Sequence, residues 1–180
     1  MVAGRGGART SACCALRMLW ITGLLCCVSC ASASFASGIY DDGTVRYHIG
    51  ELGRGWQRVE VEDNDLAFHH GQHGTISINS TCRDYNDVPE QALMNQLLFG
   101  MRDRDYRVEE TVTVDGRGAL HDVVDLTLDG VPLTLEVYLI KKDGCVYDLT
   151  RICARSAFES GRTDFAAVVA GFKVLRTKLD

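Results

Sequence analysis

The chain has 180 residues, 46% of them hydrophobic and 24% charged, and its formal net charge is −5 at pH 7. This length supports one domain of ordinary size, and the globular composition excludes whole-chain disorder, a collagen helix and a coiled coil. No uninterrupted run of about 18 apolar residues occurs, so the sequence contains no ordinary membrane-spanning helix.

The first 29 residues have the pattern of a secretory signal peptide. They carry three arginines and no acidic residue, and a short apolar run, residues 18–29, follows the third arginine. A basic start, an apolar core of about 7–15 residues and small residues at the end are typical of an export signal. The same run is shorter than the roughly 20 residues that cross a bilayer as a helix. We therefore expect residues 1–29 to direct export and to be removed.

Two cleavage sites compete at the end of this segment. Val28-Ser29-Cys30-Ala31 resembles a bacterial lipobox, in which a lipidated cysteine becomes the new N-terminus, although Cys27 replaces the usual Leu. The competing site is residues 31–33, an A-x-A sequence for the ordinary signal peptidase. We expect lipidation at Cys30, which would attach the protein to a membrane through acyl chains. The residue after this cysteine is Ala31 and not Asp, which favours the outer membrane of a Gram-negative envelope.

The chain that remains after export is acidic and begins with a polar segment. Because the leader removes three positive charges, 16 of the 19 basic residues and all 24 acidic residues remain, a net charge of −8. Nucleic-acid binding needs basic patches that displace counterions, so this balance argues against a nucleic-acid partner. Residues 30–44 are small and polar, and we expect a flexible tether there and a folded domain over residues 45–180.

The first part of that domain predicts short strands divided by turns. Apolar and polar residues alternate around residues 59–61, 66–68 and 75–82, as in strands with one buried face. In the third run Cys82 lies on the apolar face, so we expect it to be buried. Residues 71–74 carry turn signals and are expected to connect the second and third strands.

A helix is predicted after residue 87. Asp87 is expected to cap its N-terminus, with Pro89 in the first turn and Glu90 three residues after the cap. An apolar stripe with the spacing i, i+3, i+4, i+7 follows, made of Met94, Leu97, Leu98 and Met101. Gly100 lies near the expected end of this helix.

A four-stranded antiparallel meander is predicted next. Asp115-Gly116, Asp129-Gly130 and Asp143-Gly144 are hairpin signals spaced 14 residues apart. In the stretches beside these turns apolar residues alternate with polar ones, so each strand is expected to have one buried face.

A second helix is expected near the C-terminus. Its apolar face consists of Phe165, Val168, Val169 and Phe172, and Thr163 is the expected N-cap. Because two amphipathic helices need a sheet surface to cover, the predicted class is α+β: an antiparallel sheet with a four-stranded meander, packed against two or more helices.

This order of elements resembles the PsbP/Mog1-like fold of photosystem assembly proteins, nuclear-transport accessory proteins and small bacterial lipoproteins. The resemblance spans about residues 45–175 and is carried by Trp56, Leu66, Phe68, Ile76, Ile78, Tyr147, Asp148 and residues 165–172. It is a pattern of core positions and not a chemical motif. Members mostly bind other proteins or assist assembly, so the resemblance implies a sandwich fold and a binding module, without any site residue.

Export favours a disulfide, and three cysteines of the domain are candidates: Cys82, Cys145 and Cys153. The last two lie eight residues apart in one predicted strand, about 26 Å when extended. A disulfide requires alpha carbons within about 7 Å. The sequence therefore predicts that Cys82 pairs with Cys145 or with Cys153, and that one thiol stays free.

The candidate metal ligands are His69, His70 and His73 in the predicted hairpin turn. Imidazole is a common metal ligand, and a tight turn could bring two of these rings together. The segment lacks the helical H-E-x-x-H arrangement and an evident fourth ligand. We therefore interpret them as polar turn residues, and a metal-dependent hydrolase that uses this turn is the alternative.

Asp148 stands out because its neighbours Val146 and Leu149 are apolar. Such a carboxylate either has a structural role, paired with Arg151 or in a turn hydrogen bond, or is an acid with a perturbed pKa in a groove. We adopt the structural interpretation.

Together these features predict an exported, lipid-anchored envelope protein that faces the periplasm or the exterior. Its domain would bind an unidentified envelope protein or a small ligand, without a cofactor and without catalytic activity. The alternative is the metal-dependent hydrolase.

Overall fold

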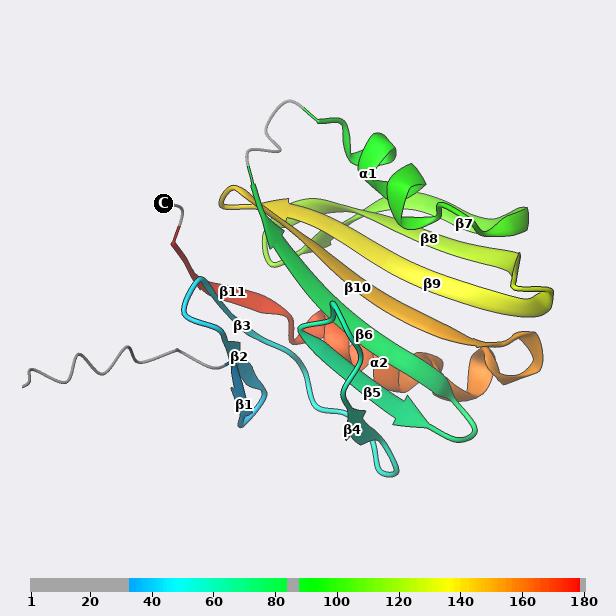
Figure 1. Cartoon of the computed structure of the whole chain (residues 1–180), viewed down its shortest axis with the longest axis horizontal. Helices are drawn as coiled ribbons and strands as arrows, with labels where there is room; N and C mark the ends of the chain where they lie inside the picture. Colours follow the sequence, from blue (N-terminus) through cyan, green and yellow to red (C-terminus); the bar gives the residue numbers. More distant parts are fainter. Residues whose placement is uncertain (1–32, 84–87, 179–180) are drawn as a thin grey trace, which may run out of the picture. The chain divides into compact units, whose positions relative to one another are not determined.

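The computed structural model describes residues 33–83 and 88–178, which form an α+β domain of two antiparallel sheets and two α-helices (Figure 1). The predicted signal peptide, the lipidation site at Cys30 and the predicted helix cap Asp87 lie outside the described residues. Within these two ranges no helix combines the length and apolar character needed to cross a membrane.

The larger sheet has seven strands in the order β4-β5-β6-β10-β9-β8-β7. Their bounds are β4 Gln57–Val59, β5 Leu66–His70, β6 Gly74–Cys82, β7 Arg102–Val114, β8 Arg117–Leu128, β9 Val131–Lys142 and β10 Cys145–Ala154. The last four strands are neighbours in chain order, which confirms the predicted meander. The first predicted strand is shorter than expected, because β4 ends at Val59 and Val61 is exposed in the turn that follows.

The turns of the meander follow from local sequence. The aspartates at positions 115, 129 and 143 and the glycines that follow them all have positive φ angles. Positive φ at both central residues is the geometry of a type I′ turn, whose twist matches that of the strands it joins.

The smaller sheet was not expected. It has the order β1-β2-β3-β11, with bounds β1 Ser34–Ala36, β2 Ile39–Asp41, β3 Val45–His48 and β11 Lys173–Thr177. The prediction of a flexible tether is therefore wrong from residue 34 onward. Tyr40 is buried and stacks on Tyr47 with ring centroids 5.0 Å apart, and this burial holds the first hairpin in the fold.

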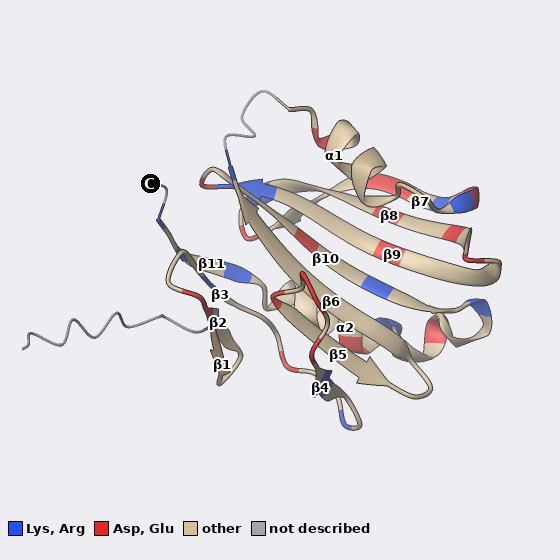
Figure 2. Ribbon diagram, in the orientation of Figure 1, with Lys and Arg blue, Asp and Glu red and all other residues tan. Residues whose placement is uncertain are grey.

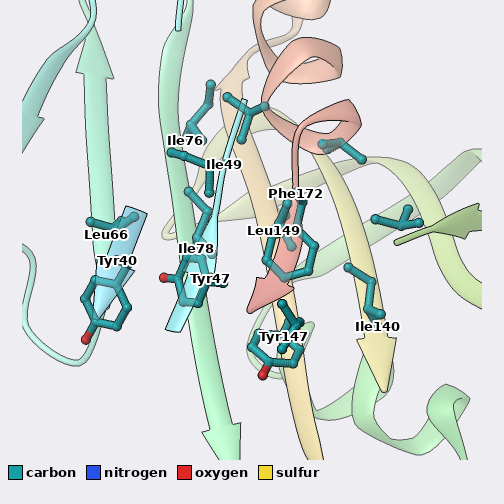
Figure 3. Packing of buried hydrophobic residues seen from close by; sticks show 14 of the residues in the cluster. Tyr40, Tyr47, Ile49, Leu66, Ile76, Ile78, Ile140, Tyr147, Leu149 and Phe172 are labelled. Atoms are coloured by element: carbon teal, nitrogen blue, oxygen red, sulfur yellow. The ribbon is translucent and has the colours of Figure 1, made fainter. Parts of the chain in front are cut away.

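The two faces of the larger sheet are covered by different elements. The smaller sheet and the helix α2, Arg162–Ala170, cover one face, which we call the α2 face; two 3-10 turns, η1 Arg155–Ala157 and η2 Glu159–Gly161, lead into this helix. Aromatic rings fill the core there (Figure 3), including Tyr47, Tyr147 and Phe172, with Tyr147 and Phe172 5.4 Å apart. The helix α1, Glu90–Leu97, covers part of the opposite face, the α1 face.

Both helices differ at their ends from the predictions. Pro89 occupies the N-cap of α1 and not its first turn, although Met94 and Leu98 are buried as expected. In α2 the N-cap is Gly161, and Thr163 lies inside the helix, so the predicted cap is wrong. The physical reason is that the turn η2 runs directly into α2 and starts the helix earlier than its apolar stripe suggests.

The disulfide joins Cys82 and Cys145, and Cys153 is free and buried. The first two are register partners at the end of the β6–β10 ladder, with alpha carbons 4.1 Å apart. Cys153 lies opposite Thr134 of β9, near the other end of β10. Register therefore decides between the two pairings that the sequence left open.

Candidate functional site: a groove between α1 and the large sheet

A groove of about 270 Å³ lies between α1 and the larger sheet. Its lining consists of Thr81 of β6, Leu93, Gln96 and Leu97 of α1, Leu139 of β9, and Val146 and Asp148 of β10. The helix packs on apolar side chains of β8, β9 and β10, and among the described residues β6 contributes none to this cluster. The groove therefore has an apolar side under α1 and a polar side toward β6.

Thr81 and Asp148 form the polar side, and Asn79 lies beside Asp148 in the sheet. Asn79 of β6 and Asp148 of β10 are register partners, and the Asn79 Nδ2 donates a hydrogen bond of 2.8 Å to the Asp148 Oδ1. The Asn79 Oδ1 is buried and has no hydrogen-bond partner among the described residues. Among the described residues, the salt bridges that the structure shows do not include Asp148.

The environment favours the neutral form of this carboxyl group. The pKa of Asp148 is raised from 3.8 to about 6. Burial is the largest cause, the hydrogen bond from Asn79 acts in the opposite direction, and the negative charge of Asp65 adds to the rise. Among the described residues, no cation contributes to this shift. A cation from outside would favour the ionised form by direct attraction.

One of the two structural roles that we expected for Asp148, the pairing with Arg151, is wrong. Asp148 and Arg151 are three residues apart in one strand, so their side chains point to opposite faces of the sheet and cannot pair. The groove, which was the other interpretation, is where Asp148 lies. The role of Asn79 was missed, because only the register of β6 against β10 brings it beside Asp148.

The three histidines do not converge. His69 and His70 are adjacent in β5 and therefore point to opposite faces, and the His69 Nδ1 lies 3.1 Å from the Thr75 Oγ1. The rings of His70 and His73 stack with centroids 4.0 Å apart, and lone pairs in parallel ring planes do not meet at one point. In residues 33–83 and 88–178, no group of three or more His, Cys, Asp or Glu side chains is placed to hold a metal ion.

His73 instead belongs to a cluster at the start of α2. The Asp164 Oδ2 accepts a hydrogen bond of 2.9 Å from the Trp56 Nε1 and lies 3.5 Å from the His73 Nδ1. The ring of Trp56 lies 5.5 Å from that of His70. These contacts tie the segment before β4 to the β5–β6 turn and to α2, which is a structural role.

A buried charge network on the α2 face was also missed. Glu136 and Arg151 are register partners on β9 and β10, two neighbouring strands that both carry charged positions (Figure 2), and their nearest charged atoms are 3.3 Å apart. His121 bridges the Glu136 Oε1 at 3.3 Å and the Glu110 Oε1 at 2.9 Å. Burial lowers the pKa of His121, but the two glutamates outweigh it and the net shift is upward. Alternation could have revealed Arg151, which shares a face with Tyr147 and Leu149.

A second cavity, of about 490 Å³, lies where the β1–β2 turn meets the end of β3. Its lining is Phe35, Ser37, Gly38, His48, Ile49, Gly50, Glu51 and Leu52. The His48 Nδ1 is already engaged with the Gly171 carbonyl oxygen at 2.8 Å, and Glu51 is exposed to solvent. The α1 groove is the better candidate site because its carboxylate is partly buried and has no ionic partner in the part of the chain that the structure describes.

No protein-family model and no curated protein sequence matches the chain. Among solved structures, LpqN of Mycobacterium tuberculosis, described as involved in cell envelope biogenesis, matches with a TM-score of 0.55 and 12% identity over 77% of this chain and 87% of that one. Cyanobacterial PsbP (CyanoP) from Synechocystis sp. PCC 6803 matches with a TM-score of 0.51 and 15% identity over 82% of this chain and 95% of that one. At these identities the likeness concerns the fold alone. The chain has the PsbP-like fold.

Proposed function

We propose that the protein is an exported, lipid-anchored envelope protein that binds a partner in the groove between α1 and the larger sheet, without catalysing a reaction. The observation that carries this proposal is the groove itself, which combines an apolar side with one partly buried carboxylate. Most catalytic sites combine a reactive side chain with a second reactive group within hydrogen-bonding distance of it. Among the described residues, the one side-chain hydrogen bond of Asp148 is with the amide of Asn79, an arrangement suited to binding.

The envelope assignment is supported by the N-terminal sequence and by a relative in fold. The pattern of residues 1–29 is that of an export signal, and Cys30 stands in a lipobox-like sequence. LpqN, which shares the fold, is described as involved in cell envelope biogenesis.

Mass spectrometry of the mature N-terminus tests the anchor. We expect an acylated mass at Cys30 that is lost in the Cys30→Ala variant. A free N-terminus at Ser34 would instead identify a released protein, with cleavage after the A-x-A sequence, and would remove the membrane from the proposal.

Site-specific photo-crosslinking in cells tests the groove. A photoreactive phenylalanine analogue at the exposed position Gln96, which lines the groove, is expected to give a discrete crosslinked product. The matched control is the same analogue at Glu60, which is exposed on the turn after β4. Identical products at both positions, or none at position 96, would contradict a partner in the groove.

A further inference from the structure

We propose that the α1 groove receives a basic side chain of the partner protein, with its cationic head at Asp148 and its aliphatic stem along Leu93 and Leu97. This inference rests on the proposed function and names the chemistry that the groove selects. The first reason is the state of the acceptor atoms. Asp148 lines the groove, and among the described residues its one side-chain hydrogen bond comes from Asn79.

The Asp148 side chain offers more acceptor sites than the described residues fill. An ionised carboxylate has about four lone-pair sites. A buried acceptor without a donor is unfavourable, and a buried carboxylate without a cation is more so. An ammonium group supplies three hydrogen-bond donors and one positive charge, so it can fill the open acceptor sites and balance the charge of the carboxylate.

The size of the groove indicates a single side chain. Pockets for drug-sized ligands occupy about 300–1,000 Å³, and this groove, at about 270 Å³, is below that range. Its apolar lining, contributed by Leu93, Leu97, Leu139 and Val146, leads to Asp148. A lysine side chain has the matching build, because a four-carbon apolar stem carries its charge at the tip.

Charge complementarity favours the same occupant. The chain has a net charge of −5, and without the predicted leader it is −8, so basic segments are attracted and acidic ones repelled. A second buried carboxylate of the same face, Asp122 on β8, does not line the groove. Asp122 is therefore a matched control for the binding of a cation by Asp148.

The test is a titration of the exported protein, as the cell produces it, with short peptides whose ends are chemically blocked. Binding is monitored by the NMR chemical shifts of the protein's backbone amides. The peptides have a Gly/Ser sequence with a central lysine, norleucine or glutamate. We expect the lysine peptide to shift the amides of groove residues such as Thr81 and Val146. We expect it to bind at least about tenfold more tightly than the norleucine peptide, as for one charge-assisted contact. Asp148→Asn should abolish this preference, whereas Asp122→Asn should leave it intact.

A second variant makes the test informative even if Asp148→Asn does not fold. Gln96→Lys places a competing cation at the groove and is expected to lower the affinity for the lysine peptide several-fold. The control is Gln91→Lys, exposed on the same helix but outside the groove, which is expected to leave this affinity unchanged.

Three results would overturn the inference. Equal binding of the lysine and norleucine peptides would show a groove that selects apolar chains, and the proposed function would stand without the cation. Binding of free butylammonium without binding of the lysine peptide would identify a small amine and not a partner side chain. If no peptide changes the amide shifts of the groove residues, the hypothesis of a bound basic side chain is wrong. The photo-crosslink at position 96 then tests the proposed function separately.

Discussion

The two faces of the larger sheet differ in whether their buried charged side chains have partners of opposite charge. On the α2 face, Glu136 and Arg151 are almost wholly buried, and they pair with each other and with His121. On the α1 face, Asp148 is partly buried, and among the described residues its one side-chain hydrogen bond comes from the amide of Asn79. A charge whose partners are internal belongs to the architecture, whereas a charge without one is available to a ligand. The difference follows from how each face is covered. The helix α1 has only eight residues and leaves part of the α1 face open to solvent.

The largest expected effect comes from breaking the internal network. Arg151→Met leaves Glu136 buried with only His121 beside it, and removing one partner of a buried ion pair costs about 3–5 kcal/mol. Urea unfolding followed by circular dichroism measures this change in the free energy of unfolding. Arg54→Met, at an exposed position, is the control and should change it by less than about 0.5 kcal/mol. A loss below about 1 kcal/mol for Arg151→Met would mean that the network does not hold this face together.

The disulfide ties the two strands that carry the polar side of the groove. Its ends are 63 residues apart, and removing such a link lowers the free energy of unfolding by about 2–4 kcal/mol. We expect this loss in the double variant Cys82→Ser/Cys145→Ser, measured by thermal unfolding. A reducing agent should destabilise the wild type similarly and leave the double variant unchanged. Equal sensitivity of both proteins to the reductant would contradict the assigned pairing.

The pH dependence of stability separates Asp148 from ordinary surface carboxylates. Its pKa of about 6 in the folded state lies above the unfolded value, so its contribution is fully present below about pH 4 and is lost as the pH rises through 6. Asp148→Asn should therefore match the wild type at pH 4 and exceed it at pH 7 by about 1–2 kcal/mol, a figure reduced for partial exposure. Asp105→Asn, on the exposed edge strand, should leave the pH profile unchanged. A constant difference between Asp148→Asn and wild type from pH 4 to 7 would refute the raised pKa.

The smallest expected effect concerns the end of α1. Phe99 is 87% exposed, whereas its neighbour Leu98 is fully buried under the same helix. Phe99→Ser should change the free energy of unfolding by no more than about 0.5 kcal/mol, while Leu98→Ala should cost about 2–5 kcal/mol. Urea unfolding compares the two, and a large loss for Phe99→Ser would indicate a packing role that its exposure does not show.

Elements with local signals were predictable. The Asp-Gly pairs at residues 115, 129 and 143 specify type I′ turns wherever they occur between alternating strands, so the meander could be predicted without tertiary information. The apolar stripes of the two helices were also readable, because helical periodicity is a property of neighbouring residues. The ends of these helices were not, because Gly161 becomes the cap of α2 only through the turn that precedes it.

Elements that depend on distant partners were not predictable. The strands β1 and β2 have only three residues each, too few to show an alternating pattern, and they belong to a sheet completed by β3 and by β11, more than 120 residues away. Neither β11 nor the fold of residues 34–44 leaves a local signal, because three-residue strands gain their stability from pairing and from the burial of Tyr40.

The sequence alone determined the fold class, the meander and the restriction that Cys82 must pair with one of two cysteines. Tertiary structure decided the pairing with Cys145, through the register of β6 against β10. It also decided the environment of Asp148, since α1 covers one part of the sheet and leaves this carboxylate beside Asn79 in an open groove. The physical reason is that patterns in sequence report which face a residue occupies. Which other residues share that face depends on pairings between strands that lie far apart in the chain.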